Sequence, residues 1–120
     1  MTDVQKPSIT LDLKKKRIRI HKHTLQQLNN PQYIQLLVNP SDKIVAIKSA
    51  NQALSSDSVH KISGHTMKSS NSIEIYSSFF IDQLLKAAEV IPSSSLLRLT
   101  GAVYKSEKAA VFPLNTLEQV

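Results

Sequence analysis

Two alternating patterns that are out of phase with each other constrain this sequence more than any other feature. Apolar residues alternate with polar ones at Ile9, Leu11, Leu13, Ile18 and Ile20. Alternation with a period of two is typical of a strand with one buried face. The step from Leu13 to Ile18 is odd, so one straight strand would expose one of the two sets. The sequence therefore predicts strands at residues 9–13 and 17–21, with a reversal or bulge at the three lysines between them.

The next stretch predicts a short helix followed by a hairpin. Thr24 is followed three residues later by Gln27, a capping-box pattern that predicts a helix at residues 24–28. The Asn-Asn-Pro sequence after it ends the helix, because the residue before proline disfavours the helical conformation. Two apolar runs, at residues 33–38 and 43–48, flank a cluster of turn-forming residues and predict a β-hairpin.

The second half of the chain begins after a polar connector at residues 49–71, in which a short strand at 59–62 and a turn at Gly64 are expected. The elements that follow are a strand, a helix, two more strands and a frayed tail, predicted at residues 72–76, 79–90, 96–104, 109–114 and 116–120. Ser77 or Ser78 is placed to cap the helix. Gly101 interrupts its strand and indicates a bulge or a close backbone approach.

The two halves repeat one order of elements, strand, helix and hairpin. The strand at 72–76 reproduces the isoleucine spacing of the strand at 17–21. A unit of this kind cannot bury its own apolar face, but two units can share one core. We therefore expect a single domain over residues 1–120 of α+β, mainly β class, folded as a small barrel of two pseudo-repeated units. The units are expected at about 9–48 and 72–114, joined by the connector at 49–71.

Composition and patterning narrow the function classes. The net charge is +6 and there is no cysteine, which excludes disulfides, thiolate metal sites and cysteine nucleophiles. The apolar runs are too short to cross a membrane, and the first residues do not look like a signal peptide, so we expect a cytoplasmic protein. The acidic residues are dispersed, and there is no glycine-rich phosphate loop or nucleophile elbow. We expect no enzyme activity and no cofactor.

The densest positive charge lies at residues 14–22, here called the basic edge. Six of the fifteen lysines and arginines belong to it: Lys14, Lys15, Lys16, Arg17, Arg19 and Lys22. Such side chains on one rigid edge neutralise phosphates and release counterions from a duplex. The alternative is a solvated edge whose lysines prevent aggregation between sheets. His21 and His23 are expected to make secondary contacts, and no metal site is expected because neither carboxylate nor cysteine stands at ligand spacing.

Residues 11–20, Leu-Asp-Leu-Lys-Lys-Lys-Arg-Ile-Arg-Ile, carry a resemblance to a known family. With the short helix and hairpin that follow, they resemble the half-motif of the MraZ and AbrB swapped-hairpin barrels, in which leucine-aspartate precedes lysine-glycine-arginine. The family's turn glycine is absent here. The resemblance implies a transcription regulator that binds double-stranded DNA through the basic edge as a homo-oligomer, a dimer or larger, in the nucleoid.

A second function is left open beside DNA binding. The chain is also compatible with a protein–protein interaction module, an inhibitor or adaptor from a phage or mobile element, that contacts a protein partner through its basic edge or the helix at 79–90. The apolar stripe of that helix consists of Phe79, Phe80, Leu84 and Leu85. We expect it to face the core, with part of it available to another subunit. RNA binding is less favoured because aromatic residues are few.

Overall fold

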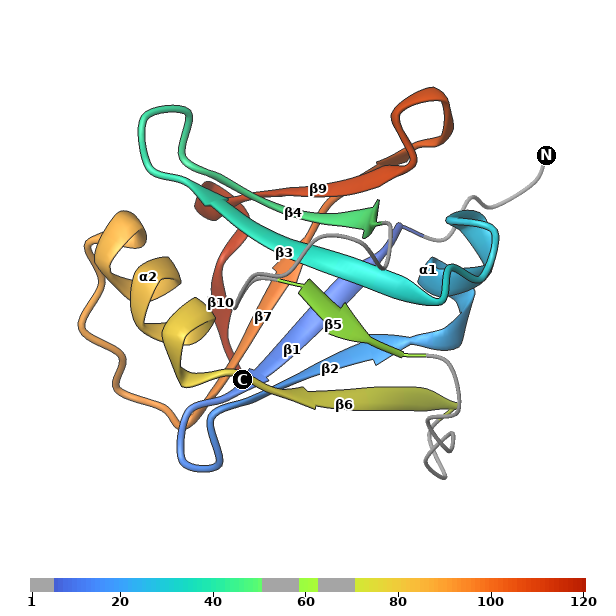
Figure 1. Ribbon diagram of the computed structural model, residues 1–120. Helices are drawn as coiled ribbons and strands as arrows, with labels where there is room; N and C mark the ends of the chain where they lie inside the picture. The colour runs from blue at the N-terminus through green and yellow to red at the C-terminus, as the bar shows by residue number, and fades with distance from the viewer. Residues whose placement is uncertain (1–5, 51–58, 63–70) are drawn as a thin grey trace, which may run out of the picture.

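The computed structural model describes residues 6–50, 59–62 and 71–120. Its strands form two five-stranded antiparallel sheets (Figure 1). Sheet A has the order β10 (Glu118–Gln119), β7 (Leu96–Thr100), β1 (Ser8–Asp12), β2 (Arg17–His21) and β6 (Ser72–Tyr76). Sheet B has the order β5 (Val59–Lys61), β3 (Tyr33–Asn39), β4 (Ile44–Ala50), β9 (Ala109–Pro113) and β8 (Ala102–Tyr104). The α+β, mainly β class is confirmed.

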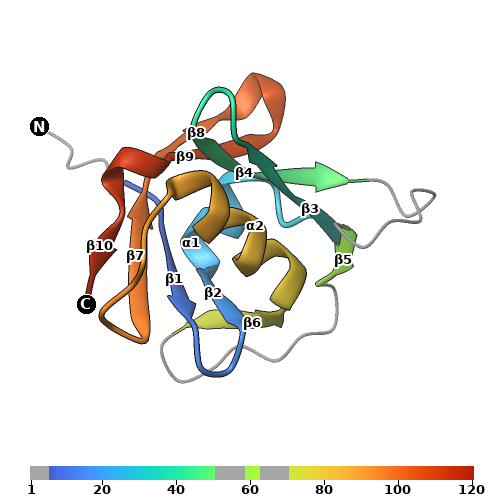
Figure 2. The ribbon, with the colours of Figure 1, turned by 90° about the vertical axis from the view of Figure 1, so that its left-hand side faces the viewer.

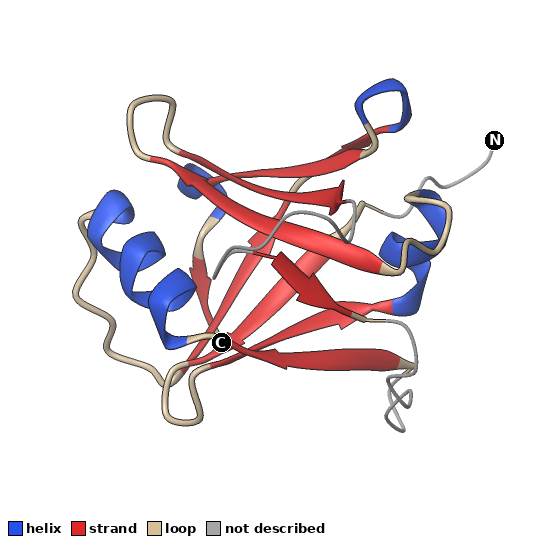
Figure 3. Ribbon diagram, in the orientation of Figure 1, coloured by secondary structure: helices blue, strands red, loops and turns tan. Residues whose placement is uncertain are grey.

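A closed barrel is not found in the part of the chain that the structure describes. No hydrogen-bonded ladder joins an edge of sheet A to an edge of sheet B, so the described strands form two layers rather than a closed cylinder. Helix α2 (Ser78–Ala88) lies at one open end of the space between the sheets and α1 (Lys22–Gln27) at the other (Figures 1, 2 and 3). These helices cover apolar side chains that closure of a barrel would otherwise have enclosed.

The hairpin predicted at the lysines is confirmed. Strand β1 pairs with β2 so that Ile9 lies opposite Ile20 and Leu11 opposite Ile18. All four side chains point to the inner face of sheet A and are at most 1% exposed. The odd step between the two sets is absorbed by a turn at residues 13–16, within the predicted reversal.

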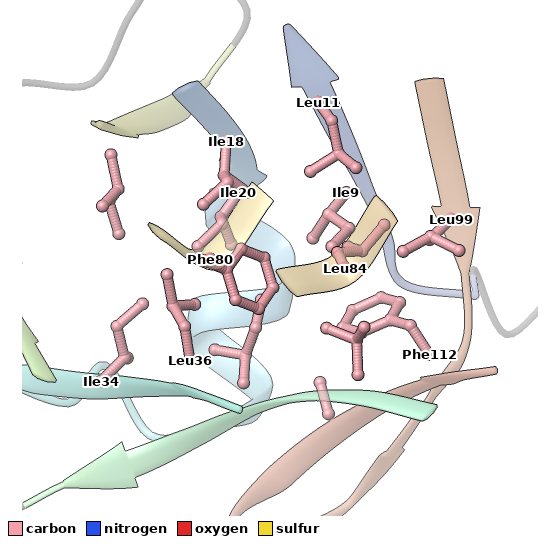
Figure 4. Packing of buried hydrophobic residues seen from close by; sticks show 14 of the residues in the cluster. Ile9, Leu11, Ile18, Ile20, Ile34, Leu36, Phe80, Leu84, Leu99 and Phe112 are labelled. Atoms are coloured by element: carbon pink, nitrogen blue, oxygen red, sulfur yellow. The ribbon is translucent and has the colours of Figure 1, made fainter. Parts of the chain in front are cut away.

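The core fills the space between the two sheets (Figure 4). Side chains from sheet A and sheet B point toward one another, and Phe80 and Leu84 of α2 lie between them. Ser77 caps α2, as predicted, by accepting a hydrogen bond from the backbone N–H of Phe80 at 3.2 Å. Phe79 differs from the predicted core stripe, because its side chain is 56% exposed.

Helix α1 starts earlier than the capping-box pattern predicts. It begins at Lys22, and His21 is its N-cap, with Nδ1 accepting a hydrogen bond from the N–H of His23 at 3.0 Å. Thr24, the predicted cap, lies inside the helix and is 2% exposed. The imidazole thus takes the role that the threonine hydroxyl was expected to play.

Gly101 marks the point at which the chain passes from sheet A to sheet B. Strand β7 ends at Thr100, and β8 begins at Ala102. The Gly101 N–H donates to the carbonyl of Pro7 at 2.9 Å, and a Cβ on Gly101 would lie 1.9 Å from the carbonyl oxygen of Val111. The predicted close backbone approach is therefore confirmed.

The predicted frayed tail is wrong. After the 3₁₀ turn η2 (Leu114–Thr116), strand β10 pairs with β7 at the edge of sheet A. The hydroxyl of Thr116 donates to the carbonyls of Thr100 and Pro113 and holds this turn against the sheet. A second 3₁₀ turn, η1 (Lys105–Glu107), connects β8 to β9. Gly64 and its predicted turn lie outside the described residues.

Candidate nucleic-acid interface

The turn between β1 and β2 holds two lysines away from the core. The side chain of Asp12 accepts hydrogen bonds from the backbone N–H groups of Lys14 and Lys15, each at 3.1 Å, which fixes the turn. Lys14 and Lys15 are exposed, and no ion pair involves either of them within the described residues. Lys16 has a φ of 54°, in the left-handed region that favours glycine.

The two arginines of the basic edge lie on the outer face of sheet A, beside carboxylates. Arg17 contacts Glu74 with Nη1 to Oε2 at 2.7 Å and Asp12 with Nη2 to Oδ2 at 3.4 Å. Arg19 contacts the same Oε2 of Glu74 at 3.2 Å. Glu74 stands opposite Arg19 on the neighbouring strand β6. These contacts place both guanidinium groups beside the carboxylate of Glu74.

The charge state of Arg17 follows from these neighbours. Partial desolvation acts to lower its pKa, but a side-chain hydrogen bond with Tyr76 and the charges of Glu74 and Asp12 act in the opposite direction. The net result is that the pKa of Arg17 is raised above its ordinary value. Arg17 is therefore a permanent cation whose charge is already balanced within the sheet.

The basic edge is contiguous in sequence but divided in space. Strand β2 separates the turn from Lys22, His21 and His23, and five residues of strand span about 17 Å. At the turn, Lys16 forms an ion pair with Asp82 of α2, Nζ to Oδ1 at 2.9 Å, in which both side chains are well exposed. An exposed pair of this kind contributes little and exchanges readily for another anion. The cations available to a ligand therefore concentrate at the turn.

Two exposed aromatic rings flank the turn, and sequence reasoning missed both. Tyr76 is 64% exposed and Phe79 is 56% exposed. The N–H of Ser77 donates to the carbonyl of Lys16 at 3.0 Å, so this aromatic segment lies beside the lysines. The Ser77 cap in the sequence could have indicated this, because a helix that starts after Ser77 and buries Phe80 turns Phe79 outward. Two exposed aromatic rings therefore lie close to the lysines of the turn.

The rest of the outer face of sheet A carries mixed charge. Across one row of the sheet, Glu118 stands opposite Arg98, Arg98 opposite Thr10, and Thr10 opposite Arg19. A cavity of about 180 Å³ lies on this face, lined by Thr10, Asp12, Arg17, Arg19 and Leu96. Alternating charges give a face that is close to neutral away from the turn.

The described residues contain neither a cluster of metal-ligating side chains nor a membrane-spanning helix. Within the described part of the chain, no three histidine, cysteine or acidic side chains gather to form a metal site. No helix there has the length and apolar character needed to cross a membrane. Comparison with protein-family models, with curated proteins and with solved structures found no match to this chain.

Proposed function

We propose that this protein binds double-stranded DNA through the turn between β1 and β2 and acts as a transcription regulator of the MraZ/AbrB type in the cytoplasm, on the nucleoid. The observation that carries the proposal is the turn itself. It presents Lys14 and Lys15 exposed and without a carboxylate partner in the described residues. Mobile lysines on a rigid turn attract phosphates by releasing counterions.

Backbone geometry supports the resemblance on which the regulator type rests. The family places a glycine before its arginine, and Lys16, which precedes Arg17, has the backbone conformation that glycine favours. Strands β2 and β6 pair antiparallel with Arg19 opposite Glu74, two positions separated by 55 residues. The same offset relates Ile18 to Ile73, as expected for two swapped-hairpin units related by a pseudo-twofold axis.

The arginines have a different role from the lysines in this proposal. The carboxylate of Glu74 fixes the orientation of Arg17 and Arg19 before DNA arrives. Preorganised guanidinium groups lose little conformational freedom on binding. We propose that Lys14 and Lys15 make the first electrostatic contacts with the phosphates, and that Arg19, the more exposed arginine, then contacts the backbone next to the turn.

The outer face of sheet B supports a homo-oligomer. Leu37, Ala46, Val111 and Ala102 stand in one row across β3, β4, β9 and β8. Leu37 is 37% exposed, and an apolar row across four strands is an unusual surface for a monomer. We propose that a second copy of the chain covers it. Leu37→Lys then yields a monomer in light scattering, whereas a wild-type monomer that captures a different protein favours the interaction-module alternative.

The DNA proposal is tested by fluorescence anisotropy with a labelled random-sequence duplex at 50 and 200 mM salt. Lys14→Glu with Lys15→Glu is expected to weaken binding about tenfold or more at the lower salt, because two phosphate contacts are reversed. The matched control is Lys61→Glu with Lys86→Glu, two exposed lysines on β5 and α2, which changes the net charge equally. Equal weakening by both variants, or no wild-type binding at 50 mM salt, overturns the proposal.

A further inference from the structure

Three adjoining cavities lie at the opposite end of sheet A from the lysine turn, where the chain enters β1 beside α1. Their volumes are about 390, 260 and 70 Å³, and Lys6 lines all three. The two larger cavities also share Gly101 and Ala102, so they adjoin each other, and together they are here called the Lys6 groove. A cavity of about 390 Å³ lies in the range that holds small ligands.

The side chains of the Lys6 groove are positive or neutral. Lys105 joins Lys6 in the largest cavity, and His21 and His23 line the smallest one. No aspartate or glutamate lines any of the three cavities among the described residues. Neither Lys6 nor Lys105 takes part in an ion pair within the described chain. A concave surface with cations and no carboxylate concentrates anions.

An aromatic ring stands beside these cations. Tyr104 lines the second cavity with Lys6 and is 53% exposed; it is the last residue of β8, in which the preceding Val103 packs against the core. Exposed tyrosines stack on planar rings, and this contribution does not depend on which base is present. Gly101 lines both of the larger cavities.

We propose that the Lys6 groove binds a nucleoside phosphate, with the base stacked on Tyr104 and the phosphates between Lys6 and Lys105. Two sources carry this chemistry: a free nucleotide, or the phosphorylated end of a single strand of nucleic acid. The site is separate from the lysine turn, since strands β1 and β7 run the length of sheet A between them. It stands whether or not the turn binds duplex DNA.

The test is isothermal titration calorimetry on the full chain with ADP, with a 5′-phosphorylated single-stranded decamer, and with inorganic phosphate. Lys6→Gln with Lys105→Gln is expected to weaken the binding of ADP or decamer about tenfold or more, because two charge-assisted contacts are lost. Tyr104→Ala is expected to weaken ADP or decamer but leave the binding of inorganic phosphate unchanged. Lys61→Gln with Lys86→Gln, two exposed lysines on β5 and α2, is the charge-matched control and is expected to leave ADP binding unchanged.

The outcomes separate the sources and the alternatives. Binding of ADP identifies the free nucleotide as the source, and binding of the decamer alone identifies the strand end. Absence of heat with both, or equal loss in the Lys6/Lys105 variant and in the control, overturns the proposal. An unchanged affinity in Tyr104→Ala overturns the stacking of the base. Melting temperatures of all variants within error of the wild type show that the fold is intact.

Discussion

We predict that Gly101→Ala destabilises the fold, because there is no room for a Cβ at this position. A Cβ at Gly101 would lie 1.9 Å from the carbonyl oxygen of Val111, 2.8 Å from its carbonyl carbon and 2.9 Å from Cα of Phe112. All three atoms belong to the backbone of β9, so no side-chain rotation relieves the contact. The strands have to move apart by about 1.5 Å to reach ordinary van der Waals distance.

The magnitude follows from this displacement. Inserting one carbon into a well-packed site costs about 1–3 kcal/mol, and the upper end applies here because two backbone segments must shift. A loss of about 3 kcal/mol lowers the melting temperature of a domain of this size by about 12 °C. At a site without such a contact, the same substitution stabilises by about 0.4–1 kcal/mol, because alanine restricts the unfolded chain. A clash with β9 therefore predicts a lower melting temperature for Gly101→Ala, whereas restriction of the unfolded chain alone predicts a higher one.

Thermal melting followed by circular dichroism, together with urea unfolding, measures the effect. Ala102→Gly is the control at the neighbouring exposed position and is expected to lower the free energy of unfolding by no more than about 1 kcal/mol. A Gly101→Ala protein that melts at or above the wild-type temperature refutes the reasoning about the crossing from sheet A to sheet B.

Three further predictions concern single side chains. Nε2 of His60 is buried without a hydrogen-bond partner among the described residues, and desolvation lowers the pKa of His60. As the pH drops, His60 therefore takes up a proton at a higher pH in the unfolded chain than in the folded one, so the free energy of unfolding falls below about pH 6.5. Urea unfolding at pH 7.5 and 5.5 should show a smaller fall in the free energy of unfolding for His60→Gln than for the wild type. An equal fall in the two proteins contradicts this role of His60. Lys108, with φ of 51°, should be replaceable by glycine with a gain of about 1 kcal/mol, and a lower melting temperature speaks against strain there. Ser77→Ala should lose about 1 kcal/mol through the α2 cap, whereas Ser78→Ala should lose less; equal losses exclude the cap.

Much of the fold could be predicted because local patterns determine it. The alternation in β1 and β2 predicts those two strands, and the turn residues between β3 and β4 predict their hairpin, without reference to the rest of the chain. The pairing of β10 with β7 and the absence of a closed barrel depend on contacts between distant segments, which no local pattern reports. His21 replaced Thr24 as a cap because a histidine cap has no sequence signal as clear as the capping box.

The candidate site could be predicted only in part for the same reason. The positive charge of the basic edge is visible in the sequence, but the carboxylates that balance its arginines are not. Glu74 lies 55 residues from Arg19 and meets it only because β6 pairs with β2. Phe79 belongs to the apolar stripe predicted for the core, but its side chain is exposed, because adjacent residues of a helix point about 100° apart and Phe80 is the one that is buried. Lys6 and Tyr104 are separated by most of the chain, so their common groove has no local signature.

The salt dependence of duplex binding in Glu74→Gln tests the role of the basic edge most directly. This substitution removes the carboxylate that pairs with Arg19, whereas Glu89→Gln makes the same change of net charge at the far end of α2. We predict that Glu74→Gln, which also frees Arg17 from the carboxylate that balances its charge, steepens the slope of log affinity against log salt by about 0.9, one phosphate contact by Arg17 in addition to that of Arg19, and that Glu89→Gln leaves it unchanged. Equal slopes in the wild type and both variants would contradict DNA binding at this edge.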